Sequence, residues 1–237
     1  VEFEVLRRQP KILTQSSVSR KIPLDKIITK KDKNIIRNNK VLDKFKGCIY
    51  GLAIDAGTTT IVMNLIDLET NETVTTASFE NPQRFGGSDV MHRISYDGGP
   101  FHGELQQALL SSVNFEIGDM CRRVKVRRRQ IYEIIVVGNS TMRDIFFGID
   151  VQSIGERPYR SLTEQDFMSG KRTTTSITTT AKDIGVRIHP EATVYGGPLI
   201  GSHIGSDQLG GGLCVHFQRR ARYHKASLPE RCTQRHF

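Results

Sequence analysis

The chain has 237 residues, of which 37% are hydrophobic and 7% aromatic, so it can bury a core, and this composition excludes an intrinsically disordered protein. No apolar run approaches the roughly 20 residues that cross a bilayer, and the first residues show no signal-peptide pattern, so a cytoplasmic protein with no membrane partner is expected. The formal net charge of +9 comes mainly from two basic segments, 122–129 and 218–237, which argues against a nucleic-acid partner bound across the whole surface.

Residues 1–46 are rich in Lys, Arg, Asn and Asp and lack a sustained hydrophobic period, which predicts a linker with at most one short strand or helix. Three strand-like runs follow at residues 50–55 (YGLAID), 59–68 (TTIVMNLIDL) and 72–80 (ETVTTASFE). Consecutive strands joined by tight turns predict an antiparallel meander.

A long amphipathic helix is predicted over residues 101–124, because its apolar residues recur at intervals of three and four. The basic run 122–129 is expected to end this helix, where cations complement the helix dipole and stay solvated. No aromatic side chains are interleaved with that run, so no nucleic-acid interface is predicted there. Asp89 is expected in the first turn of a helix that precedes the long one.

The run IYEIIVVG at 131–138 is almost wholly apolar, which favours a buried central strand. Asn139 or Ser140 is expected to cap the next helix, which stops at Gly148. The polar residues 171–180 predict an exposed loop, and ATVYG at 192–196 predicts a further strand. Strands alternating with helices in this way indicate an α/β fold.

Cysteine and histidine spacing gives no metal site. Cys48, Cys121, Cys214 and Cys232 form no CxxC pair, so they are expected to be reduced thiols. The histidines of the last third of the sequence have no matched ligand spacing: His203, His216, His224 and His236.

The unit with most chemical content is the turn between the first two predicted strands, from Asp55 to Thr60. Gly57 allows a close backbone approach, so that successive amides can face an anion, and the hydroxyls of Thr58, Thr59 and Thr60 add donors. Asp55 ends a strand, where a carboxylate can hold the water shell of Mg²⁺. The same residue types also occur in ordinary β-hairpin turns, so the motif alone leaves open whether this turn binds phosphate or is only structural.

Four blocks in order make the sequence recognisable: 50–70 with the glycine turn, 81–96 (NPQRFGGSDVMHRISY), 131–150 with VVGNSTMRD, and 194–207 (VYGGPLIGSHIGSD). In these blocks the chain resembles the reductive activators of corrinoid proteins, whose ATPase core belongs to the superfamily of acetate kinase, sugar kinases, heat-shock chaperones and actin. The resemblance implies a ribonuclease-H-like mixed sheet that opens with an antiparallel three-strand meander and carries flanking helices, as in an actin-like ATPase half.

The resemblance also implies roles for particular residues. Asp55 with Gly57, Thr58 and Thr59 matches the first phosphate motif, with Asp55 as the catalytic residue that holds Mg²⁺ through water. Gly138 and Asn139 match the segment that connects the two halves of the fold. The implied cofactors are ATP and Mg²⁺, and the implied partner is a corrinoid protein or cobalamin-dependent methyltransferase, with a homodimer left open.

The same resemblance gives expected domain limits. Residues 1–46 match a linker that follows a ferredoxin-like domain, which would hold a [2Fe-2S] cluster and is expected either upstream in a longer protein or to be missing, and 47–207 match the first ATPase subdomain. Asp207 is expected to cap a helix, with a place in the nucleotide cleft as the alternative. After it, residues 208–237 depart from the pattern and look like the start of a truncated or aberrant region. A cut boundary, a truncated gene or a shifted reading frame near Gly212 would each account for this departure.

The expected function is therefore ATP binding within an activator that drives reduction of cob(II)alamin to cob(I)alamin. Two alternatives remain: a non-catalytic interaction module of the same fold, and another superfamily ATPase such as a dehydratase activator or a sugar kinase. Nucleic-acid binding through the basic segments is a third, and it would show a steep salt dependence.

Overall fold

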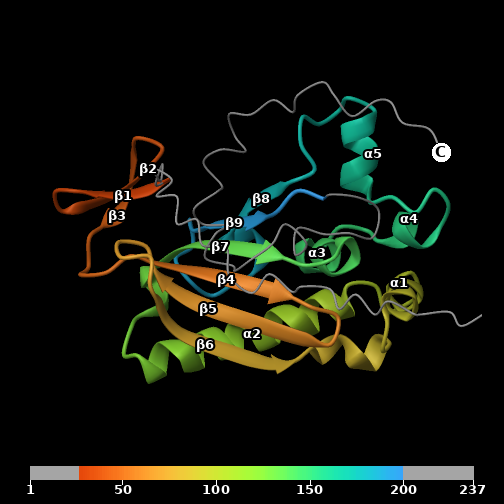
Figure 1. The fold of residues 1–237 in the computed structure, drawn as a ribbon, viewed down its shortest axis with the longest axis horizontal. Coiled ribbons are helices and arrows are strands. Elements are labelled where there is room, and N and C mark those ends of the chain that lie inside the picture. Colours follow the sequence, from red (N-terminus) through yellow and green to blue (C-terminus); the bar gives the residue numbers. More distant parts are fainter. Residues whose placement is uncertain (1–26, 200–237) are drawn as a thin grey trace, which may run out of the picture.

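The computed structural model describes residues 27–199, and within this range the strands form two sheets (Figure 1). The strands are β1 (Ile28–Lys31), β2 (Asn34–Arg37), β3 (Lys40–Lys44), β4 (Tyr50–Ala56), β5 (Thr60–Asp67), β6 (Thr73–Glu80), β7 (Ile131–Val137), β8 (Ile177–Thr180) and β9 (Thr193–Gly196). The helices are α1 (Val90–Asp97), α2 (Glu104–Arg123), α3 (Ser140–Phe147), α4 (Gln152–Gly155), α5 (Leu162–Met168) and α6 (Ala181–Ile184), with 3₁₀ turns η1 (Pro82–Gly86) and η2 (Arg128–Gln130). None of the helices in this range is both long and apolar enough to cross a membrane.

The larger sheet has six strands in the order β6-β5-β4-β7-β9-β8. The first three strands form the antiparallel meander that the sequence predicted, whereas β7 pairs parallel to β4 and β9 pairs parallel to β7. In the β4–β7 register Asp55 lies opposite Val137, so the carboxyl ends of these two strands finish level with each other. The expected ribonuclease-H-like mixed sheet with flanking helices is confirmed.

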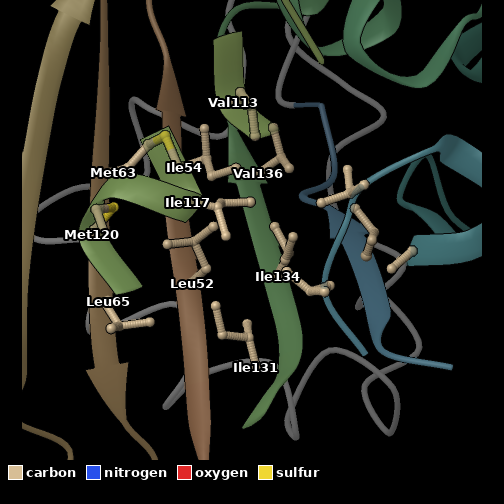
Figure 2. Close-up of a cluster of buried hydrophobic side chains, with 14 of the residues drawn as sticks. Leu52, Ile54, Met63, Leu65, Val113, Ile117, Met120, Ile131, Ile134 and Val136 are labelled. Atoms are coloured by element: carbon tan, nitrogen blue, oxygen red, sulfur yellow. The ribbon is translucent and has the colours of Figure 1, made fainter. Parts of the chain in front are cut away.

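One face of this sheet packs against α2 (Figure 2). Leu109, Val113, Ile117 and Met120 follow one another at helical spacing, and all four are buried against alternate residues of β4, β5 and β7. Figure 2 shows Val113 and Ile117 among Ile54, Leu52, Ile134 and Val136. The predicted helix over 101–124 is therefore confirmed, and the apolar stripe that predicted it forms the main core.

The opposite face carries the three-stranded sheet β1-β2-β3, which the sequence did not predict. Ile28 and Ile35 are buried there with Ala53 of β4 and Tyr132 of β7. The expectation of at most one short element in residues 1–46 is therefore wrong. The strands are only four or five residues long, too short for a hydrophobic period, and their turns use Asp32 and the Asn38–Asn39 pair in left-handed conformations.

Polar contacts also join the small sheet to the large one. The Asp43 carboxylate accepts a hydrogen bond from the Tyr132 hydroxyl at 3.0 Å and lies 3.5 Å from Nε2 of His189. Arg37 Nη1 donates to the carbonyl of Glu191 at 2.6 Å. Burial lowers the pKa of His189, and the Asp43 carboxylate opposes this shift.

Residues 171–180 also differ in part from the expected loop, because Ile177–Thr180 form the edge strand β8, antiparallel to β9. Consecutive β-branched residues favour an extended backbone once a neighbouring strand is available. The predictions for Asp207, His203 and the sequence after Gly212 fall outside the described residues.

Candidate functional site

The turn between β4 and β5 consists of Gly57, Thr58 and Thr59, and it depends on a glycine for space. A Cβ built on Gly57 would lie 2.5 Å from the carbonyl oxygen of Thr60, closer than real Cβ atoms approach a backbone atom. Any other residue would therefore push the turn open. Thr58 is half-buried, whereas Thr59 and Thr60 are exposed.

All three carbonyl oxygens of this turn are held by donors. The Gly57 oxygen accepts from Nδ2 of Asn81 at 2.8 Å, the Thr58 oxygen from Nη2 of Arg93 at 2.7 Å, and the Thr59 oxygen from the Asn81 amide at 2.8 Å. In a trans peptide the N–H points opposite to the carbonyl. The N–H groups of Thr58, Thr59 and Thr60 consequently point away from the donors on Asn81 and Arg93.

A buried polar layer behind the turn keeps these donors in place. Oδ1 of Asn81 accepts from the Gln83 amide at 2.9 Å, which caps η1, and Gln83 in turn donates to the carbonyl of Leu105 at 3.0 Å. Arg93, on α1, also donates to Oε1 of Gln83 at 3.2 Å. No role for these three residues could be predicted from the sequence, since nothing in a single sequence shows that an arginine in a short helix is buried.

The connection from β7 to α3 closes the other side of the turn. A Cβ on Gly138 would lie 2.8 Å from the carbonyl oxygen of Ala56, so glycine lets this connection pass close to the end of β4. Asn139 caps α3 by accepting from the Met142 amide at 2.9 Å, and its Nδ2 donates to Oγ1 of Thr58 at 3.1 Å. Of the two caps considered from the sequence, Asn139 is the one observed, and the helix stops at Gly148 as expected.

The structure thus brings together residues that the sequence proposed from separate segments. Asp55 is half-buried at the penultimate position of β4, and Figure 1 shows β4 and β7 pointing the same way, with α3 beginning beyond β7. By the alternation of side chains along β4, Asp55 faces away from the α2 side. The threonine turn and the amino terminus of α3 meet at the carboxyl edge of the sheet, a place where phosphate groups commonly bind in α/β proteins.

A second buried network extends from α3 toward the end of β9. Arg143 and Asp144 form a fully buried ion pair at 2.6 Å, and Nη1 of Arg143 also donates to the carbonyl of Gly197 at 3.0 Å. The Ser161 hydroxyl donates to the other Asp144 oxygen at 2.5 Å. Burial raises the pKa of Asp144, and the charge of Arg143 opposes the rise. The pair ties the segment after β9 to the helix that begins at Asn139.

Comparison with known proteins places this arrangement in a family. The sequence model described as "RACo middle region" matches residues 50–220, well over half of the chain. The chain belongs to the RACo middle-region family. The matched range begins at the first strand of the large sheet and includes every residue of the turn and of the Gly138–Asn139 connection.

Two known proteins that are similar to this chain are named as corrinoid activators. The "Corrinoid activation enzyme RamQ" of Eubacterium limosum is 28% identical over 181 residues, which are 73% of this chain and 29% of that protein. A solved structure described as "Reductive activator for corrinoid,iron-sulfur protein" has a TM-score of 0.67 and 30% identity, covering 77% of this chain and 29% of its own. The chain therefore spans 29% of the length of each of these relatives.

Proposed function

We propose that this chain binds the triphosphate of ATP with Mg²⁺ as the nucleotide-sensing part of a reductive activator of corrinoid proteins. One observation carries the proposal. The turn 57–59, whose carbonyl oxygens are held by Asn81 and Arg93, lies against the capped amino terminus of α3. Membership of the RACo middle-region family supports the corrinoid assignment over a dehydratase activator or a sugar kinase.

The residues present fit a polyphosphate. Gly57 and Gly138 let the turn and the β7–α3 connection pass close to neighbouring carbonyl oxygens, where a Cβ would not fit, so both segments can lie at the proposed site. The amides of Thr58 and Thr59 and the hydroxyls of the turn are the proposed phosphate donors, with Asn139 at the connection. Asp55 is the proposed carboxylate for the water shell of Mg²⁺, the ion that neutralises phosphate charge when it is bound.

In the whole protein we propose that nucleotide binding drives a change that allows uphill reduction of cob(II)alamin to cob(I)alamin. The electron would come from a [2Fe-2S] cluster in a separate ferredoxin-like domain, and residues 47–207 would form the first ATPase subdomain. A ligand that binds one conformation better than another can supply the free energy for such a step. The proposed partner is a corrinoid protein or a cobalamin-dependent methyltransferase, with a homodimer as a further proposal.

The test is a calorimetric titration of the chain with Mg-ATP and with Mg-tripolyphosphate. Tripolyphosphate lacks the nucleoside, so its binding measures the contribution of the phosphate contacts alone. We expect Asp55→Asn and Thr58→Val to weaken both ligands. Thr76→Val is a matched control, because Thr76 lies on β6, where its hydroxyl donates to Asn64 at 2.7 Å far along the strand from the turn.

The outcomes separate the alternatives. Binding that the two site variants weaken and Thr76→Val leaves unchanged supports the nucleotide role. Absence of binding by the unaltered chain rejects it and favours a non-catalytic interaction module of the same fold. Binding of DNA or RNA with a steep salt dependence would instead favour the basic segments as the functional surface.

A further inference from the structure

Arg93 is a buried cation next to the turn 57–59, and within the described residues its hydrogen bonds all go to neutral acceptors. Its side chain is 1% exposed. The guanidinium donates to the carbonyl oxygens of Thr58 at 2.7 Å and Gly87 at 3.0 Å, to Oε1 of Gln83 at 3.2 Å and to Sδ of Met142 at 3.1 Å. Arg93 therefore links α1, η1 and α3 to one carbonyl of the turn.

Within the part of the chain that the structure describes, no carboxylate is in direct contact with the guanidinium of Arg93. Among residues 27–199 the ion pairs do not include Arg93. Burial lowers the pKa of Arg93 and the charge of Asp89 opposes this shift, but the Asp89 carboxylate itself caps α1 and bonds to His92. Buried charges in proteins are normally paired, because an unpaired one is costly. The buried arginine that does have such a partner, Arg143, holds Asp144 at 2.6 Å. Arg93 thus leaves a positive potential at the turn that an anion can compensate.

We propose that Arg93 is a positioning residue that orients the backbone of the proposed phosphate site from its buried side. By holding the Thr58 carbonyl it directs the Thr59 amide, on the same peptide plane, toward the ligand side. Its buried charge also attracts phosphate through a medium of low dielectric, where such attraction is stronger than in water. The inference rests on the proposed function and adds to it a residue that does not touch the ligand.

The test compares Arg93→Met and Arg93→Lys with the unaltered chain in the Mg-tripolyphosphate titration. Arg93→Met removes the charge and the hold on Thr58, and we expect affinity to fall about tenfold or more. Arg93→Lys keeps the charge but lacks the planar set of donors, so we expect it to recover part of the loss. Val113→Ala on α2 is the control, because it destabilises the core without contacting the turn.

A purely structural role predicts another pattern. If Arg93 only supported the fold, Val113→Ala would reduce affinity as much as Arg93→Met at equal loss of stability, and Arg93→Lys would give no recovery. Unchanged affinity in Arg93→Met also overturns the inference and leaves the proposed function standing. Failure of the unaltered chain to bind tripolyphosphate rejects the proposed function, and this inference with it. In NMR spectra of Arg93→Met, the amide resonances of Thr58 and Thr59 should shift because the turn has changed. Those of α2 should stay in place, which would show that the variant is folded.

Discussion

Asn139 joins two functions that substitutions can separate: it caps α3 through Oδ1 and holds Thr58 through Nδ2. Asn139→Ala removes both contacts. Loss of an N-cap costs about 1 kcal/mol, and loss of the hydrogen bond to Thr58 costs about 1 kcal/mol more. We therefore expect the free energy of unfolding in urea to fall by about 2 kcal/mol, with an unchanged dependence on urea concentration.

Asn139→Asp keeps an oxygen for the Met142 amide, places a negative charge at the amino terminus of α3, and can accept from the Thr58 hydroxyl. We expect its stability to remain within about 0.5 kcal/mol of the unaltered protein. The added charge should repel phosphate, so binding of Mg-tripolyphosphate should be lost from a folded protein. If Asn139→Asp were as unstable as Asn139→Ala, or bound tripolyphosphate normally, the two roles assigned to Asn139 would be refuted.

Three further outcomes are expected. Gly138→Ala should lower the free energy of unfolding by about 1–3 kcal/mol and weaken tripolyphosphate binding, because the new Cβ would meet the Ala56 carbonyl at 2.8 Å; a normal urea midpoint would contradict the close approach. Arg143→Met should cost about 3–5 kcal/mol by leaving Asp144 buried and unpaired, and adding Asp144→Asn should restore part of this in the same urea assay. Burial lowers the pKa of His189, so the folded state prefers the neutral ring; stability should therefore decline as pH falls below about 6.5, and His189→Gln should flatten that slope in unfolding measured against pH.

Local signals in the sequence were sufficient for the large sheet and the helices beside it. The mostly apolar runs of β4 and β7 and the apolar spacing of α2 each reflect burial on both faces or on one, and burial leaves a recognisable pattern in the sequence. The Asn139 cap and the Gly148 stop were also predicted from residue type, because both act on neighbouring backbone groups. The four-block resemblance identified the family that the comparison then showed.

The small sheet was missed because its stability comes from contacts distant in the chain. β1 to β3 are too short and too polar to show a period, and they persist because Ile28 and Ile35 are buried on the face of β4 and β7. Likewise, β8 is a run of threonines whose strand conformation depends on pairing with β9. Propensity alone could not distinguish either segment from a loop.

The amino-acid sequence by itself determined the elements around the candidate site and the residue types in its turn, since glycine, threonine and a capping asparagine act through local geometry. Only the tertiary structure decided which groups surround that turn. The parallel pairing of β4 with β7 sets Gly138 beside Ala56, and burial of α1 puts Arg93 against the Thr58 carbonyl. These contacts join residues more than thirty positions apart, and no pattern within a single segment encodes which distant partner will satisfy a buried carbonyl or charge.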